Sequence, residues 1–187
     1  CNLRCEHCYI APELLSDRSQ MSEEVYRKTF DKIEELFKAD RKVSKINVEL
    51  LGGELTMMPL AFWERNLPWT LERMASWDAL YDAEASLIWC TNLIFKDPGY
   101  VDLLNRMGEQ YPSGIDLFVP WEPDTNRFKK DLRLLPRYLQ TLKAITVIAD
   151  GPEFLVDTFL PAGITDITCD MLYPAGSGKT YFSRACS

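Results

Sequence analysis

The sequence predicts an α/β fold with a parallel β-sheet. Five short segments have the apolar patterns of strands, and the segments between them carry apolar residues at helical spacing. Strands that alternate with helices along a chain run parallel in the sheet. With 187 residues, of which 47% are hydrophobic, the chain is long enough to bury one substantial core. We therefore expect a single domain over residues 1–187.

The first helix and the first strand are predicted from residue 22 onward. Apolar residues recur at helical spacing over 22–39, and Ser22 stands at the position of an N-cap. Residues 46–51 instead alternate apolar with polar residues, which is the period of a strand. The polar residues of this strand, Asn47 and Glu49, are expected on the face of the sheet opposite the helices.

The later elements follow the same alternation. Residues 59–77 are predicted to form a helix that Pro68 can interrupt. Asp97 and Pro98 mark the start of a further helix, and Gly108 is expected to end it. The other predicted strands are 86–91, 115–119, 144–149 and 166–172, and the other predicted helices are 128–142 and 150–163.

Composition and charge argue against two classes of partner. The net charge is -7, from 28 acidic and 21 basic residues, with no basic block, so a nucleic-acid partner is not expected. No apolar run approaches the ~20 residues that a membrane helix needs, and the N-terminal stretch lacks the pattern of an export signal. We therefore expect a cytoplasmic protein with no membrane partner. Because the chain begins on Cys1 and stops soon after a loop, we also expect it to be one domain of a longer protein.

Three cysteines fall within the first eight residues, CNLRCEHC. Cys1, Cys5 and Cys8 are close enough in sequence for one loop to bring three thiols to one inorganic group. A disulfide framework suits short secreted chains and fits poorly here. Zinc with His7 as a fourth ligand is an alternative, although His7 adjoins Cys8, which makes joint tetrahedral ligation awkward. An iron–sulfur cluster also suits clustered thiolates, and three cysteines would leave one iron of a four-iron cluster without a protein ligand.

Two motifs carry a resemblance to a known family. Cys1-x3-Cys5-x2-Cys8, followed by the aromatic Tyr9, resembles the signature loop of the radical S-adenosylmethionine (radical SAM) enzymes. The stretch LLGGELT at 50–56 is similar to their Gly-Gly-Glu motif at the end of the second strand. The family core is a partial (β/α)6 TIM-like barrel with parallel strands. The resemblance therefore implies a first strand ahead of Cys1 in addition to the five predicted from the sequence.

The resemblance implies a radical SAM core domain with two cofactors. Cys1, Cys5 and Cys8 would hold a 4Fe-4S cluster, and the remaining iron would bind the amino and carboxylate groups of S-adenosyl-L-methionine (SAM). One electron from the cluster would cleave SAM to a 5′-deoxyadenosyl radical that abstracts hydrogen from a substrate. The cofactors would supply this chemistry, and the protein would supply placement and a dry cavity. Such a reaction belongs to an oxidoreductase or a transferase.

The resemblance also implies which residues bind SAM: Tyr9, Gly52, Gly53, Glu54, Thr91 and Asn92. The two glycines would let the backbone turn and approach SAM, and Glu54 or the glycine backbone would meet the methionine ammonium. Tyr9 would lie against the adenine. Thr91 and Asn92 are similar to the Thr-Asn pair that often ends the third strand in the family, at the barrel rim where ligands gather. An ordinary turn after the strand is the alternative for this pair.

Two later stretches match the family less well. Residues 117–130, LFVPWEPDTNRFKK, lack the Ser-x-Asp-Gly that ends the fourth strand in many members, which leaves Glu122 and Asp124 as weak candidates for the ribose contact. Residues 173–180, YPAGSGKT, end in Gly-Lys-Thr but lack the first glycine of a phosphate-binding loop. They resemble instead the loop that follows the last barrel strand.

The substrate and partners are expected by the same resemblance. A peptide or protein substrate is the first hypothesis and a small molecule the second, with a reductant such as flavodoxin or ferredoxin supplying electrons. The competing hypothesis is a non-enzymatic iron–sulfur electron carrier or a zinc-stabilised binding module. An electron carrier usually completes its cluster with a fourth cysteine, which is absent near Cys8, and a zinc module has no need of Gly-Gly-Glu at a strand end.

Overall fold

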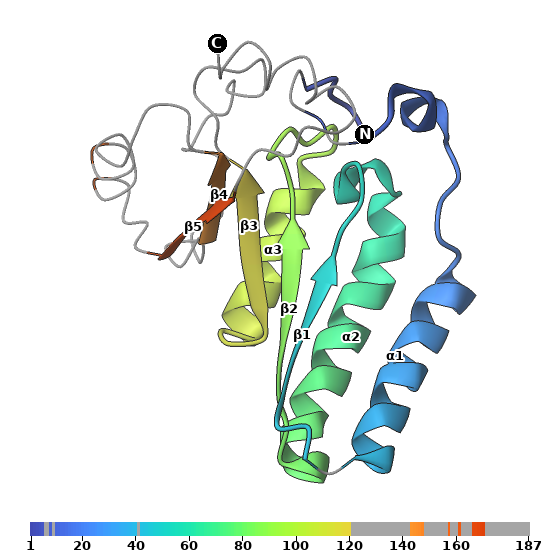
Figure 1. Ribbon diagram of the computed structural model, residues 1–187, viewed down its shortest axis with the longest axis vertical. Coiled ribbons are helices and arrows are strands. Elements are labelled where there is room, and N and C mark those ends of the chain that lie inside the picture. Colours follow the sequence, from blue (N-terminus) through green and yellow to red (C-terminus); the bar gives the residue numbers. More distant parts are fainter. Residues whose placement is uncertain are drawn as a thin grey trace.

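The computed structural model describes residues 1–5, 8, 10–40, 42–120, 143–147, 157, 161 and 166–170. Within this part of the chain, five strands form one sheet in which every pairing is parallel. They lie in the order of the chain: β1 (Lys45–Leu50), β2 (Glu84–Cys90), β3 (Ile115–Pro120), β4 (Lys143–Val147) and β5 (Asp166–Asp170). The sheet is open rather than closed into a barrel (Figure 1). The predicted α/β fold with a parallel sheet is confirmed.

Three helices of the described part pack on one side of the sheet, one ahead of β1 and one in each connection between the first three strands (Figure 1). They are α1 (Glu23–Ala39), α2 (Leu60–Tyr81) and α3 (Gly99–Gln110). Two 3-10 turns, η1 (Pro12–Ser16) and η2 (Leu55–Met57), stand at the end of the molecule toward which β1 and β2 point. Among the described helices, none combines the length and apolar character needed to cross a membrane.

Side chains on the strands alternate between the two faces of the sheet. Val48 of β1, Leu87 of β2 and Leu117 of β3 belong to, or pack against, one hydrophobic core shared with the helices. Asn47 and Glu49 are exposed on the opposite face, as predicted. This alternation places the apolar half of each strand against the helices.

The N-terminus of α1 follows the sequence prediction. Ser22 caps the helix, because its Oγ accepts a hydrogen bond from the backbone N–H of Val25 at 3.2 Å. Tyr26 and Phe30 on the next turns are buried against α2. The Tyr26 hydroxyl shares a buried hydrogen bond of 2.8 Å with Thr70 of α2, and burial raises the pKa of Tyr26 to about 12.

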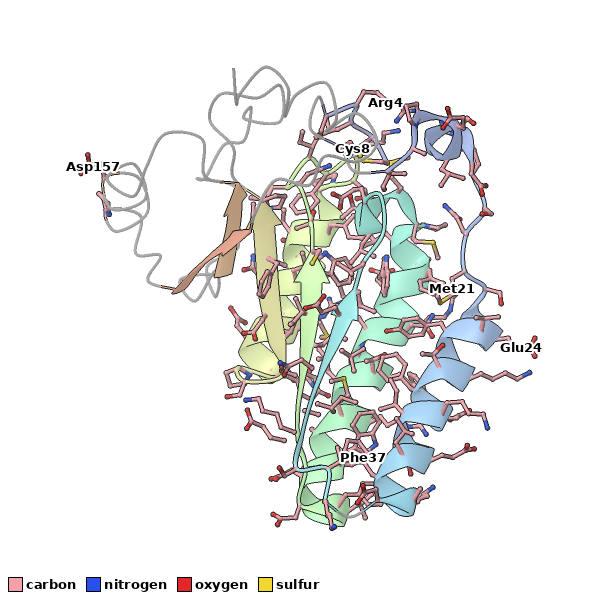
Figure 2. All side chains as sticks on the ribbon, viewed as in Figure 1. Arg4, Cys8, Met21, Glu24, Phe37 and Asp157 are labelled. Atoms are coloured by element: carbon pink, nitrogen blue, oxygen red, sulfur yellow. The ribbon has the colours of Figure 1, made fainter. Side chains whose placement is uncertain are left out.

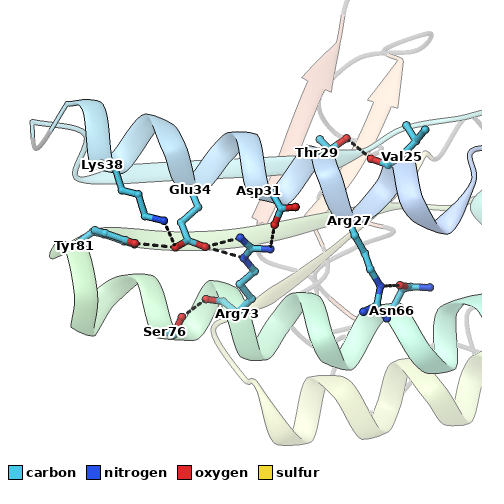
Figure 3. Close-up of polar contacts among 10 residues, drawn as sticks. All are labelled: Val25, Arg27, Thr29, Asp31, Glu34, Lys38, Asn66, Arg73, Ser76 and Tyr81. Carbon is cyan, nitrogen blue, oxygen red and sulfur yellow. Dashed lines mark hydrogen bonds and ion pairs between the residues drawn. The ribbon is translucent and has the colours of Figure 1, made fainter.

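Farther along, a group of charged side chains joins α1 to α2 (Figure 3). The Arg73 guanidinium donates to Glu34 Oε2 through Nη2 at 2.5 Å and Nε at 2.9 Å, and to Asp31 at 2.6 Å. Tyr81 and Lys38 contact the other oxygen of Glu34, at 2.8 and 3.1 Å. The hydrogen bonds from Arg73, reinforced by those from Tyr81 and Lys38, lower the pKa of Glu34 to about 2. These contacts stabilise the packing of α1 on α2.

Two helix-breaking signals in the sequence do not act as expected. Helix α2 continues through Pro68 to Tyr81. Pro68 leaves the carbonyl of Glu64 without an N–H partner, but Glu64 is exposed and water can solvate that oxygen. The predicted end of the next helix at Gly108 is also wrong, because α3 runs on to Gln110. Gly108 remains helical and buried instead of taking the left-handed conformation with which a glycine ends a helix.

Candidate active site at the carboxyl ends of the strands

Three segments meet beyond the carboxyl ends of β1 and β2. The cysteine loop lies against Gly53, which follows β1, and Asn2 reaches the loop after β2 that begins at Thr91. Figure 2 shows Arg4 and Cys8 at this same end of the molecule. Parallel strands bring their carboxyl ends to one edge, which is where ligands bind in barrel folds. The structure thus brings Cys1, Gly53, Glu54, Thr91 and Asn92 together, and Cys5 and Cys8 follow in the same loop as Cys1.

Gly53 allows the closest approach between the cysteine loop and the sheet. A Cβ added at Gly53 would lie 2.7 Å from Cys1 Cβ and 2.8 Å from the Cys1 nitrogen, far inside normal contact distance. A Cβ added at Gly52 would meet nothing closer than Leu55 Cδ2 at 3.8 Å. The two glycines of the motif therefore differ: the second seats Cys1, whereas the first has room for a side chain.

Glu54 is buried, with 7% of its surface exposed, and its carboxylate joins the ends of two strands. Oε1 accepts hydrogen bonds from the Thr56 backbone N–H at 3.2 Å, the Thr56 hydroxyl at 3.0 Å and the Thr91 hydroxyl at 2.8 Å. Oε2 accepts one from the Asn92 backbone N–H at 2.8 Å. A buried carboxylate needs such donors to offset the loss of water. Glu54 therefore fixes the end of β1 to the loop after β2.

The turn that follows Glu54 is held by two side chains of the core. The Trp63 indole donates to the carbonyl of Leu55 at 3.0 Å. The Tyr100 hydroxyl donates to the carbonyl of Met58 at 2.5 Å, and burial raises the pKa of Tyr100 to about 12. Hydrogen bonds from α2 and α3 thus fix the backbone directly after the Gly-Gly-Glu segment.

Thr91 and Asn92 use their side chains within the protein. The Thr91 hydroxyl, besides donating to Glu54, accepts a hydrogen bond from the Leu93 N–H at 3.2 Å. The Asn92 oxygen accepts one from the Ile94 N–H at 2.9 Å. Both side chains are buried at 3% exposure. These two residues shape the loop after β2 and hold Glu54, and an ordinary structural turn stays the alternative to a pair that faces SAM.

Asn2 belongs to the same network and was not among the residues predicted from the sequence. Its oxygen accepts a hydrogen bond from Asn92 Nδ2 at 2.8 Å, and its Nδ2 donates to the Ile94 carbonyl at 2.8 Å. The signal available in the sequence was an amide side chain between the first two cysteines. Its partners lie 90 and 92 residues away, so the sequence did not reveal them.

The three loop cysteines are partly exposed, and Cys1, Cys5, Cys8 and Cys90 form no disulfide. A turn connects two of them, since the Cys8 N–H donates to the Cys5 carbonyl at 3.2 Å. Among the described residues, no three His, Cys, Asp or Glu side chains converge as a single metal ion requires. In a four-iron cluster each cysteine binds a different iron, so the cysteines lie farther apart than the ligands of a single metal ion. The donor set of three thiols on one loop fits such a cluster.

Several predicted residues lie outside the described part of the chain. These are Tyr9, the expected adenine contact, and His7, the alternative zinc ligand. The same holds for Glu122 and Asp124 and for residues 173–180. Their roles stay predictions.

A groove of about 560 Å³ opens beside Cys1 and Gly53. It follows the edge of β1 and is bounded on the other side by η1 and the start of α1. Exposed apolar side chains line part of it, including Leu14, Met21 and Leu51. Within the described sheet β1 pairs on one side only, so the groove lies on the edge where the predicted strand ahead of Cys1 would pair. That strand stays a prediction.

The open parallel sheet, with its loops gathered at the carboxyl edge, has the fold of a partial radical SAM barrel. No protein-family model matches the chain, and no curated protein matches it in sequence. Among solved structures, it is similar to native anSMEcpe with bound AdoMet and Kp18Cys peptide, with a TM-score of 0.56. It is similar also to a histidine-tagged anSMEcpe with bound AdoMet, with a TM-score of 0.54.

These neighbours are anaerobic sulfatase-maturating enzymes, which are radical SAM enzymes. In both comparisons the identity is 15%, and the match covers 92% of this chain but 48% of the other. The chain thus spans about half the length of the structures it matches. A likeness at this identity shows the fold, and the predicted fold class is confirmed at that level.

Proposed function

We propose that this chain is the core domain, over residues 1–187, of a radical SAM enzyme. The observation that carries the proposal is the seating of Cys1 on Gly53, because it brings the cysteine loop onto the Gly-Gly-Glu motif. The hydrogen-bonded loop that begins with Thr91 and Asn92 stands beside them. Three motifs far apart in sequence thus adjoin one another at the edge where barrel folds bind ligands.

Cys1, Cys5 and Cys8 would hold a 4Fe-4S cluster, with SAM on the iron that has no cysteine. When bound, these cofactors would supply a one-electron cleavage of SAM that starts hydrogen abstraction from the substrate. The protein's part is to place them. Gly53 has no Cβ and so leaves room for Cys1 at the strand end, and the core residue Trp63 holds the turn after Glu54 by a hydrogen bond. Such placement can contribute several kcal/mol to lowering a reaction barrier.

The hydrogen bonds at the strand ends favour one division of roles within the SAM site. The carboxylate of Glu54 already accepts four hydrogen bonds from the protein. The backbone carbonyls of Gly52 and Gly53 are therefore the better acceptors for the methionine ammonium. Thr91 and Asn92 would border SAM through their backbone while their side chains hold the loop. Tyr9 is assigned to the adenine.

A peptide or protein is the proposed substrate, with a small molecule as the second candidate. Support comes from the neighbour anSMEcpe, which was solved with a bound Kp18Cys peptide. A reductant such as flavodoxin or ferredoxin and a reducing cytoplasmic setting complete the proposal.

The experiment that tests the function is an anaerobic assay on the full-length protein. The protein is reconstituted with iron and sulfide and mixed with dithionite and SAM, and 5′-deoxyadenosine is quantified by mass spectrometry. Cys5→Ala is the control. Product that disappears in the Cys5→Ala variant supports reductive SAM cleavage.

A protein that holds a four-iron cluster and forms no product would instead support the electron-carrier alternative. Zinc in place of iron, found by metal analysis, would support the binding module. Both results would refute the proposed enzyme.

A further inference from the structure

Asn2 carries two hydrogen bonds that tie the cysteine loop to the loop after β2. Its oxygen and its nitrogen have different partners, Asn92 Nδ2 and the Ile94 carbonyl, both at 2.8 Å. The two partners are themselves linked, since the Ile94 N–H donates to the Asn92 oxygen at 2.9 Å. Each polar atom of the Asn2 carboxamide is therefore matched, and no other side chain of similar size offers a donor and an acceptor in this arrangement.

These contacts close a ring that begins and ends at the cysteine loop. Cys1 packs on Gly53, and the next residue, Glu54, accepts a hydrogen bond from the Asn92 N–H at 2.8 Å. Asn92 then donates to Asn2, which directly follows Cys1 in the chain. Cys1 is thus held from two directions, by van der Waals contact with Gly53 and by hydrogen bonds one residue later.

We infer that Asn2 is a positioning residue for Cys1: it transmits the fixed geometry of the loop after β2 to the first cysteine of the cluster-binding loop. The consequence of this positioning for SAM binding rests on the proposed function. Without Asn2, the cysteine loop would lose its link to the loop after β2, while the contact of Cys1 with Gly53 would remain. The thiol would then take a range of positions relative to the carbonyls of Gly52 and Gly53.

The ring can be tested on the full-length protein without any cofactor. Cysteine alkylation by iodoacetamide is followed by mass spectrometry, with the rate at Cys1 measured relative to Cys90. Asn2→Leu removes both hydrogen bonds at similar volume, and we expect the relative rate to rise about tenfold or more, since each of the two bonds corresponds to roughly a two- to tenfold change in an equilibrium. Asn2→Asp keeps the acceptor but places a carboxylate oxygen against the Ile94 carbonyl, so the relative rate should rise here too.

A matched control separates positioning from general loss of stability. Thr70→Val removes the buried hydrogen bond to Tyr26, between α1 and α2, and leaves the cysteine loop untouched. We expect it to lower the thermal midpoint without raising the relative rate at Cys1. An unchanged Cys1 rate in both Asn2 variants, or an equal rise in Thr70→Val, would overturn the inference.

A second measurement asks whether the ring acts as one unit on SAM. In the reconstituted protein, SAM is titrated against the electron paramagnetic resonance spectrum of the reduced cluster. Asn2→Leu should raise the half-saturating SAM concentration about tenfold while iron content stays at the wild-type level. Adding Asn92→Leu to Asn2→Leu should cost less than Asn92→Leu costs in the wild-type protein, because the two residues share one hydrogen bond, whereas fully additive losses would refute the ring.

Failure of the proposed function gives a different pattern. If the wild-type protein binds no four-iron cluster, or binds one without cleaving SAM, the alkylation result still decides whether Asn2 positions Cys1. If 5′-deoxyadenosine forms but alkylation is unaffected, the enzyme proposal stands and the role of Asn2 is refuted.

Discussion

Replacing Gly53 by alanine tests how the cysteine loop is seated on the sheet. The new methyl group would lie 2.7 Å from Cys1 Cβ, 2.8 Å from the Cys1 nitrogen and 3.1 Å from its Cα. Favourable carbon–carbon contacts need about 3.5–4.0 Å, so the two segments must separate by about 1 Å. Because two of these atoms are backbone, a rotamer change cannot relieve the clash. Cys1 itself must move.

The cost follows from that displacement. Overpacking of this kind typically destabilises a protein by about 1–3 kcal/mol, and a 1 Å misplacement at a reaction site can lower its rate by roughly 100-fold. We therefore expect Gly53→Ala to bind less than the full complement of iron after anaerobic reconstitution. We also expect it to form 5′-deoxyadenosine about 100-fold more slowly than the wild-type protein.

Gly52→Ala is the matched control for iron binding. Its added methyl group would meet no heavy atom closer than 3.8 Å, which is an ordinary contact, so iron content should match the wild-type protein. The assay is iron and sulfide analysis of both variants, with circular dichroism to compare their folding. Wild-type iron content together with a wild-type rate of product formation in Gly53→Ala would refute the seating argument.

Three further predictions concern stability. Glu54→Ala leaves the Thr91 hydroxyl and the Asn92 N–H without an acceptor. We therefore expect the free energy of unfolding, measured with urea and without any cofactor, to fall by about 3 kcal/mol. A residue that served SAM alone would leave this free energy unchanged. Glu34→Gln should cost about 1–2 kcal/mol at neutral pH. The pKa of Glu34 falls from 4.5 to about 2 on folding, so its contribution to the free energy of unfolding is present above pH 4.5 and is lost as the pH falls toward 2. The free energies of unfolding of the wild-type protein and Glu34→Gln should therefore converge over that range. A difference that stays constant with pH would contradict the assignment. Tyr26→Phe should cost about 1–2 kcal/mol, and a urea midpoint equal to wild type would argue against its buried bond with Thr70.

The secondary structure could be predicted well because each element has its own period. Alternation in 46–51 and helical spacing in 22–39 depend only on near neighbours, and both elements were found close to the predicted bounds. Pro68 and Gly108 were misleading, since the effect of a proline or glycine depends on solvent access and packing around the helix. Those are tertiary properties.

The candidate site was predicted as a set of residues but not as a network. Glu54 and Asn92 were assigned to SAM from their motifs, and the structure joins them to each other by a hydrogen bond across 38 residues. Asn2 was missed because both of its partners come from a loop about 90 residues away. Contacts at such separations depend on strand order and register, which no local pattern encodes.

By itself, the sequence determined the alternation of strands and helices and the chemistry available at the site: three thiols, a pair of glycines and a carboxylate. It did so because apolar periodicity and side-chain chemistry are properties of short segments. Only the tertiary structure decided that Cys1 rests on Gly53, that Glu54 faces inward to the loop after β2, and that Asn2 closes the ring. The physical reason is that parallel strands bring distant loops to one edge, where steric fit and hydrogen bonding then select the partners.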